Sequence, residues 1–145
     1  MPYIKVYIHF VFTTKNRFPF LNNLETRLAV WDHIRQNCKK KGIFIDRVSG
    51  HKDHCHCLIS LGIDQTIQKV MQLIKGESSF WINKNNLIKE RFEWQDEYFA
   101  VSVSESIVEK VRNYISNQEI HHAKKSFKDE YDEFLNKYGF EKFSG

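Results

Sequence analysis

A strict alternation of side chains at residues 54–60 constrains the fold of this chain more than any other stretch. Successive side chains of a β-strand point to opposite faces, so His54 and His56 share one face while Cys55, Cys57 and Ile59 share the other. The second set predicts a face that packs on a core. Two imidazoles side by side on a rigid strand suit a divalent metal ion, but polar side chains on the solvent face of a strand remain an equally good interpretation from this stretch alone.

The periodicities on either side of this strand predict the fold class. Residues 3–14 alternate as a strand, residues 23–41 have helical spacing, and residues 43–48 form a short strand before the histidine strand. A second helix is expected to begin at Asp64 or Thr66, and a fourth strand covers residues 98–103. The order predicts an α+β, ferredoxin-like split βαβ fold: a four-stranded antiparallel sheet, two helices on one face, and the other face open.

The last third of the chain predicts further helices. A third helix is expected from residues 104–106 to about His122, with Ser106 and Glu109 as a capping box. Tyr114 and Gln118 are four residues apart and therefore lie on one face of that helix. Ser126 can cap a last helix, whose apolar stripe consists of Phe127, Tyr131, Phe134, Leu135 and Tyr138.

Composition bounds the class of protein without indicating a function. The 145 residues fit a single domain, residues 1–145, and the net charge of +4 permits a nucleic-acid partner without arguing for one. We expect a cytoplasmic protein with no membrane partner, because there is no long apolar run and no secretory leader. The odd set Cys38, Cys55 and Cys57 is read as reduced core residues rather than zinc ligands.

Five motifs taken together carry a family resemblance. They are the opening strand running into residues 13–17, the block at residues 53–59, the segment at residues 73–79, Trp94-Gln95, and Tyr114 with Gln118. In this order they resemble the single-tyrosine HUH transposases, the TnpA-like insertion sequence 200/605 family that includes the REP-associated tyrosine transposases. The resemblance implies one HUH transposase domain over residues 1–145, with C-terminal helices that carry the tyrosine.

Carried over residue by residue, the resemblance implies a set of site residues. Tyr114 is the expected nucleophile, and His54, His56 and Gln118 are the expected metal ligands. Some family members place an acidic residue three positions before the first histidine, where this chain has His51, so either His51 or Asp53 is a further candidate ligand. The implied cofactor is a divalent metal, Mg²⁺, with Mn²⁺ substituting. Because imidazole is not a favoured ligand of Mg²⁺, weak binding is expected.

The activity implied is that of a metal-dependent tyrosine DNA transposase, a strand transferase with nuclease-type cleavage. It cleaves and rejoins single-stranded DNA at element ends through a 5′-phosphotyrosine. The implied partners are a single-stranded DNA hairpin and a second copy of the chain in a homodimer, whose tyrosine helix can complete the partner's site. Side chains on the open sheet face and at its rim are candidate DNA contacts. They are Lys5, Tyr7, His9, Lys15 and Arg17.

Two alternatives stay open at this point. A domesticated nuclease that processes chromosomal repeats would use the same catalytic residues, so the sequence does not separate it from a transposase. A non-catalytic nucleic-acid-binding module could be built on the same sheet, but that reading calls for exposed aromatic side chains on the two central strands, where this chain has His54 and His56.

Overall fold

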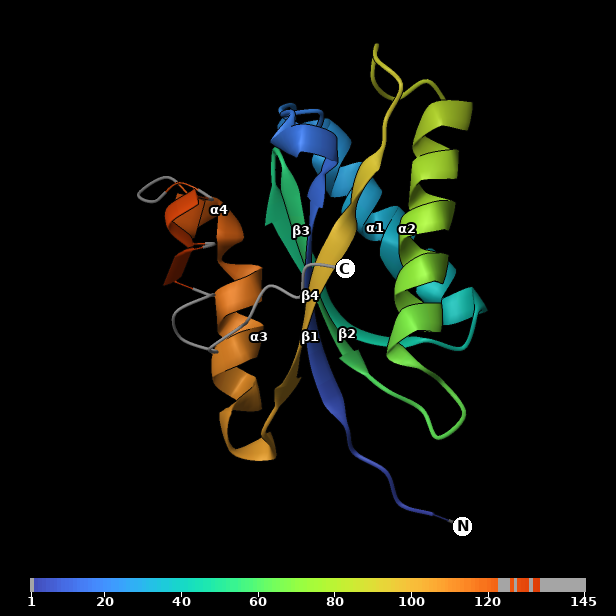
Figure 1. The fold of residues 1–145 in the computed structure, drawn as a ribbon, viewed down its shortest axis with the longest axis vertical. Coiled ribbons are helices and arrows are strands. Elements are labelled where there is room, and N and C mark those ends of the chain that lie inside the picture. Colours follow the sequence, from blue (N-terminus) through green and yellow to red (C-terminus); the bar gives the residue numbers. More distant parts are fainter. Residues whose placement is uncertain (1, 123–125, 127, 131, 134–145) are drawn as a thin grey trace.

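Four strands form one antiparallel sheet within the described part of the chain (Figure 1). The computed structural model describes residues 2–122, 126, 128–130 and 132–133. The strands are β1 (Tyr7–Thr14), β2 (Phe44–His51), β3 (His54–Ser60) and β4 (Trp94–Val103), and their spatial order is β2-β3-β1-β4. The predicted α+β fold with a four-stranded antiparallel sheet is therefore confirmed.

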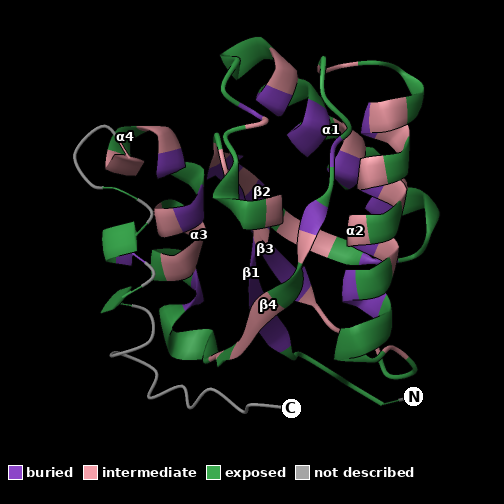
Figure 2. Cartoon of the chain, turned by 45° about the horizontal axis from the view of Figure 1, so that its top comes forward, coloured by how far each residue is buried: buried purple, intermediate pink, exposed green. Residues whose placement is uncertain are grey.

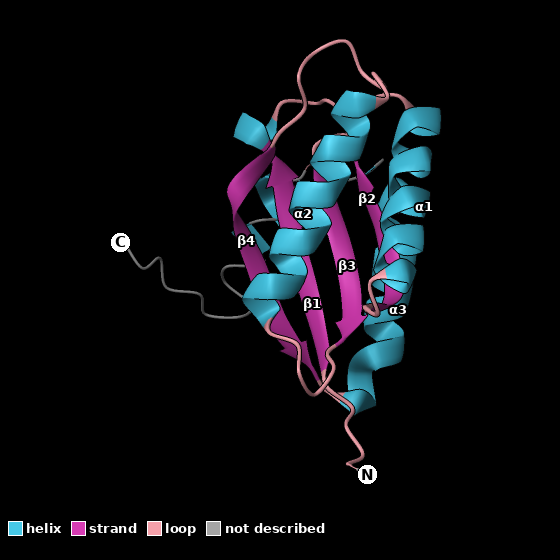
Figure 3. Cartoon of the chain, turned by 90° about the vertical axis from the view of Figure 1, so that its right-hand side faces the viewer, coloured by secondary structure: helices cyan, strands magenta, loops and turns pink. Residues whose placement is uncertain are grey.

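Helices α1 (Leu24–Lys40) and α2 (Ile67–Lys84) cover one face of this sheet, as Figure 3 shows. Each begins at a side-chain cap. Asn23 Oδ1 accepts a hydrogen bond from the backbone N–H of Thr26 at 2.9 Å, and Thr66 Oγ1 accepts one from Lys69 at 3.1 Å. Gly42 follows α1 with a φ of 72°, which a residue without a side chain adopts at little cost.

The main core lies between these helices and the sheet. It contains Cys55, Cys57 and Ile59 from β3, together with Cys38 from α1. All three cysteines of the chain lie in its described part, and they are free and buried, which confirms their interpretation as reduced core residues. The alternation in β3 thus places one set of side chains in the main core, as predicted.

The expectation that the second sheet face is open is wrong. Helix α3 (Val108–Ser116) packs on that face, and α4 (Gln118–His122) follows it (Figures 1 and 2). A small apolar cluster forms beneath α3 from Tyr7, Leu58, Val108 and Ile115. The prediction failed because β1 and β3 carry buried side chains on both faces, and these need a second cover.

Several boundaries also differ from the expected ones. Strand β1 begins at Tyr7 rather than residue 3, because β3 and β4 both end opposite Tyr7, at Ser60 and Val103. Strand β4 begins at Trp94 rather than residue 98, because Trp94 still pairs with Thr14 of β1 across a register shift.

The predicted third helix is divided into shorter elements. A 3₁₀ turn, η2 (Glu105–Ile107), precedes α3, and Asn117 separates α3 from α4. Ser104 is the cap, accepting from the N–H of Ser106, so the capping box predicted at Ser106 is wrong. The Ser126 hydroxyl accepts a hydrogen bond from the N–H of Asp129 at 3.3 Å, as expected of a cap. The predicted stripe at residues 127, 131, 134, 135 and 138 lies outside the described residues.

Among the residues that the structure describes, no helix combines the length and the apolar character needed to cross a bilayer.

Candidate active site

The two histidines of β3 lie side by side beneath α3. The side chains of His54 and His56 are fully buried, and their ring centroids are 5.1 Å apart. They face away from Cys55 and Cys57, so the expectation that both imidazoles share one face is confirmed. The site therefore begins as two imidazoles held on a strand that is paired on both sides.

Tyr114 on α3 meets this pair directly. Its ring lies edge-on to His56, with centroids 5.5 Å apart, and its hydroxyl donates a hydrogen bond to the carboxylate of Glu130. Burial, together with the negative charge of Glu130, raises the pKa of the Tyr114 hydroxyl well above its usual range. A phenol in this environment is protonated at neutral pH, so attack on phosphorus requires stabilisation of the charge that develops on its oxygen.

Gln118, the first residue of α4, brings an amide to His54. Its Oε1 lies 3.1 Å from Nε2 of His54, and its own N–H donates to the carbonyl oxygen of Tyr114 at 3.3 Å. On the opposite side of the same imidazole, Nδ1 of His54 lies 2.9 Å from Oδ1 of Asp53. A neutral imidazole carries a single N–H, and both flanking oxygens are acceptors. In the tautomer that donates to Asp53, Nε2 of His54 and Oε1 of Gln118 both present lone pairs, which a cation bound between them would accept.

A carboxylate and a further imidazole complete this group of donor atoms. The carboxylate of Glu130 is buried, and one of its oxygens lies 2.6 Å from Nε2 of His122 and 3.7 Å from Nε2 of His54. The donor atoms of His54, His122 and Glu130 all lie within 4.8 Å of one another. Burial opposes ionisation of Glu130, but hydrogen bonds from His122 and His56 outweigh it and hold the carboxyl pKa well below its usual range.

These observations fit a divalent cation, and they divide the predicted ligands into two groups. His54 and Gln118 lie together with His122 and Glu130. Both ring nitrogens of His56 face protein atoms: Nδ1 lies 2.9 Å from Nε2 of His9, and Nε2 lies 2.9 Å from Oε1 of Glu130. We call His54, Gln118, His122 and Glu130 the donor group. His56 contacts this group through the carboxylate of Glu130.

The two further candidate ligands lie at the edge of this group. Asp53 supports His54 from behind, in the manner of carboxylates that orient a metal-binding imidazole. His51 stacks on His122, with centroids 5.2 Å apart, and its Nε2 lies 3.7 Å from the carboxylate of Glu119.

Sequence reasoning missed His122 and Glu130. His122 had a usable signal, because it follows Gln118 by four residues on a helix and so shares its face. Glu130 had none, since nothing in the local pattern ties it to the histidine strand.

The predicted DNA contacts fall into buried and exposed groups. Tyr7 and His9 lie under α3, with 8% and 3% of their surface exposed, and do not reach a DNA strand while α3 is in this position. Lys5 precedes β1 and pairs with Glu105 at 2.9 Å, both side chains being well exposed. Lys15 and Arg17 lie at the other end of β1, in the 3₁₀ turn η1 (Lys15–Arg17).

Two arginines fasten the tyrosine-bearing helices. The guanidinium of Arg27, on α1, donates to both carboxylate oxygens of Glu119 on α4 at 2.7 Å, and also to two backbone carbonyls. Arg112 on α3 donates to both oxygens of Asp46 at 2.9 and 2.8 Å. Asp46 is the extra residue at a register shift in β2, where a bulge redirects the side chain. Bidentate pairs of this kind fix orientation as well as distance.

The chain is similar to known proteins over most of its length. A family model described as "Transposase IS200 like" matches residues 3–118. A candidate transposase from Deinococcus radiodurans R1 is 22% identical in sequence and superposes with a TM-score of 0.64, over 81% of this chain and 93% of that one. A REP-associated tyrosine transposase bound to a REP hairpin is 19% identical, with a TM-score of 0.62, over 84% of this chain and 72% of that one. No curated protein sequence matches the chain. At these identities the two structures establish a shared fold.

The pairing of Arg27 with Glu119 leads to a stability prediction. Arg27→Met should lower the free energy of unfolding by about 2 kcal/mol, because it leaves a carboxylate and two carbonyl oxygens without their donor. Urea denaturation followed by circular dichroism measures the change. The matched control is Arg35→Met, which removes an exposed partner of Asp32 and should change stability by less than about 0.5 kcal/mol. Equal effects of the two substitutions would contradict the role given to Arg27.

The buried imidazoles lead to a pH prediction for the metal-free protein. Burial lowers the pKa of His56 to about 4 and that of His9 well below its usual value. Below about pH 6.5 the unfolded chain takes up protons that the folded chain excludes, so stability is complete above that pH and falls as the pH drops toward 4. The loss from His56 alone is on the order of 3 kcal/mol.

Denaturant titrations in EDTA between pH 7.5 and 4.5 measure this dependence. The variant His9→Gln lacks one of the two imidazoles and should show a shallower slope. A flat stability profile for the unaltered protein would mean that these histidines are not held neutral.

Proposed function

The chain belongs to the IS200-like transposase family, and on that premise we propose that it cleaves and rejoins single-stranded DNA at element ends through a 5′-phosphotyrosine on Tyr114. The observation that carries the proposal is the meeting, within one chain, of the Tyr114 hydroxyl with the histidine pair and a cation-compatible donor group. A nucleophile and a means of stabilising phosphate charge are the two requirements of this chemistry.

The strand transfer conserves the energy of the phosphodiester bond. The Tyr114 oxygen attacks phosphorus, the bond from phosphorus to the 3′-oxygen breaks, and the phenolic proton is balanced by the proton that the released 3′-hydroxyl gains. In the second step a 3′-hydroxyl attacks the phosphotyrosine and restores the phenol. The hydrogen bond from Tyr114 to Glu130 and the edge contact with His56 hold the ring in one orientation for attack.

A divalent metal is part of the proposal. His54, Gln118, His122 and Glu130 would hold it, and His56 would support the group through Glu130. When bound, such an ion polarises the scissile phosphate and stabilises the leaving oxygen. Mg²⁺, with Mn²⁺ substituting, is the ion that the family resemblance implies. Two imidazoles among the donors favour Mn²⁺ over Mg²⁺ in the isolated protein.

We further propose a DNA hairpin as the substrate and a homodimer as the assembly. Support for the hairpin comes from the REP-associated relative, which was solved bound to one. Lys5, Lys15 and Arg17 are exposed or partly exposed cations available for phosphate contacts, while Tyr7 and His9 would need α3 to move first. Strands β2 and β4 are the edges of the described sheet, and a second copy would protect an exposed edge.

Two alternative functions, a domesticated repeat-processing nuclease and a non-catalytic binding module, fit the structure to different extents. A domesticated repeat-processing nuclease would use the same residues, and its distinction from a transposase lies in the surrounding genomic DNA. The non-catalytic binding module is disfavoured, because the central strands present buried histidines and Tyr7 under a helix where such a module needs exposed aromatic rings.

Removal of one hydroxyl tests the nucleophile. Tyr114→Phe should abolish the covalent protein–DNA band formed with single-stranded hairpin oligonucleotides in Mn²⁺ or Mg²⁺, because it deletes the attacking oxygen, together with the hydrogen bond of that oxygen to Glu130. Hairpin binding, followed by fluorescence anisotropy, should stay within about twofold of the original. The control Tyr98→Phe removes a hydroxyl from β4 and should keep the band. A band that persists in Tyr114→Phe would exclude Tyr114 from the reaction.

A mixing experiment tests which chain supplies the tyrosine. Because Tyr114 lies beside His56 of its own chain, a mixture of Tyr114→Phe chains with His54→Ala chains should remain inactive. Each variant mixed with the unaltered chain is the control and should show the activity of the unaltered chain. Cleavage restored by mixing the two variants would establish sites shared between subunits.

A further inference from the structure

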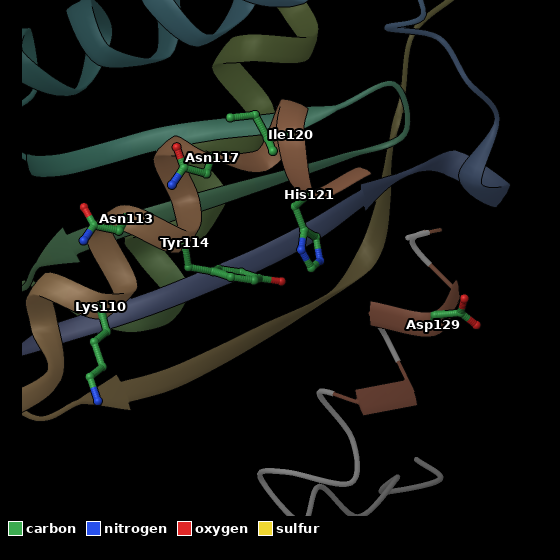
Figure 4. Close-up of a pocket in the computed structure, with 7 residues that line it drawn as sticks. All are labelled: Lys110, Asn113, Tyr114, Asn117, Ile120, His121 and Asp129. Atoms are coloured by element: carbon green, nitrogen blue, oxygen red, sulfur yellow. The ribbon is translucent and has the colours of Figure 1, made fainter. Parts of the chain in front are cut away.

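A cavity of about 730 Å³ opens beside Tyr114. Its other lining residues in the described part of the chain are Lys110 and Asn113 from α3, Asn117 between α3 and α4, Ile120 and His121 from α4, and Asp129. Figure 4 shows the Tyr114 ring directed toward His121, with Asp129 on a separate segment beyond His121. Neither His54 nor His56 is among these described lining residues. The cavity reaches Tyr114 beside His121, whose ring centroid lies 5.2 Å from that of Tyr114, whereas the donor group reaches Tyr114 through Glu130.

Polar side chains of α3 and of Asn117, which follows it, line this cavity without partners among the described residues. Lys110, Asn113 and Asn117 are exposed, and within the described residues their side chains make no hydrogen bond or ion pair. Arg112, on the same helix, is instead paired with Glu109 and Asp46. Helix α3 therefore uses one side to fasten itself to the sheet and keeps a polar row, one residue per turn, next to the nucleophile.

We propose that this cavity binds the first nucleotide on the 3′ side of the scissile phosphate. The inference rests on the proposed function, since a 5′-phosphotyrosine keeps that nucleotide joined to Tyr114 after cleavage. The leaving 3′-oxygen and the nucleotide 5′ of the cut then lie toward the histidines and the donor group. The cavity beside His121 receives the nucleotide that stays.

The lining suits one unpaired nucleotide. The volume falls in the range of sites for single small ligands. Lys110 provides a cation for the next phosphate, whereas Asp129 repels phosphate and so orients the backbone toward Lys110. The amides of Asn113 and Asn117 can exchange hydrogen bonds with a base edge, which only an unpaired base offers in full. Ile120, 65% exposed, supplies an apolar surface for the face of the base.

Abasic substrates combined with variants test the proposal. Once the cleavage site of a hairpin oligonucleotide has been mapped from its covalent adduct, matched oligonucleotides lacking the base immediately 3′ or immediately 5′ of the cut are prepared. Single-turnover cleavage rates are measured for the unaltered chain, Asn113→Ala and Lys110→Met. The control is Lys40→Met, an exposed lysine on α1 in the opposite layer. Alanine is a better helix former than asparagine, so α3 should persist in Asn113→Ala, which circular dichroism checks.

Removal of the 3′ base should slow the unaltered chain about tenfold. Asn113→Ala should cleave the intact substrate slowly, and its cleavage rate should fall little further when the 3′ base is missing. The substrate that lacks the 5′ base should slow Asn113→Ala and the unaltered chain by the same factor. Lys110→Met should reduce the slope of log affinity against log salt by about 0.7, with no change for Lys40→Met.

Additive losses from Asn113→Ala and the 3′ abasic site would overturn the proposal, and so would a coupling confined to the 5′ base. If the unaltered chain forms no adduct with any oligonucleotide, the proposed function itself fails and the subsite with it. If the unaltered chain cleaves DNA but Asn113→Ala and the 3′ abasic site show no coupling, only the proposed nucleotide site is refuted.

Discussion

The docking of α3 and α4 on the second sheet face depends on two bidentate arginine–carboxylate pairs. The apolar cluster beneath these helices is small, whereas the main core lies on the other side of the sheet. Arg112 ties α3 to the bulge residue Asp46, and Arg27 ties α4 to α1 in the opposite layer. Because Tyr114 lies between the two attachments and Gln118 adjoins the second, the position of every reactive group on these helices follows from the two pairs. Bidentate charge pairs can orient α3 and α4 on the sheet, because their geometry is defined, whereas a small number of apolar contacts does not fix the orientation of a helix.

Strand β3 serves both layers with one alternating sequence. Cys55, Cys57 and Ile59 fill the main core, and the intervening His54 and His56 meet the tyrosine helix. The burial of His56 has a cost, because an imidazole away from water does not charge readily, as the lowered pKa of His56 reflects. A hydrogen bond to Glu130 offsets part of that cost, and the carboxylates of Asp53 and Glu130 shape the group for a cation.

The sequence predicted the fold through its periodicities, because alternation and helical spacing are local properties. The four strands, the two covering helices and the shared face of His54 and His56 follow from patterns within single elements. The open second face was wrong, because no local pattern says where a C-terminal helix docks. The family resemblance named Tyr114 and Gln118, and helical spacing from Gln118 could have added His122. Glu130 was beyond reach, since its place beside His56 depends on the tertiary path of the chain.

The intramolecular meeting of Tyr114 with the histidine strand is the claim on which the account depends. Nuclear Overhauser spectra of the metal-free protein, with isotope labels on tyrosine and histidine rings, test it most directly. The account predicts a cross-peak between the rings of Tyr114 and His56, whose centroids lie 5.5 Å apart, within uniformly labelled chains. That cross-peak should vanish when tyrosine-labelled chains are mixed with histidine-labelled chains. A cross-peak seen only in the mixed sample would contradict the account.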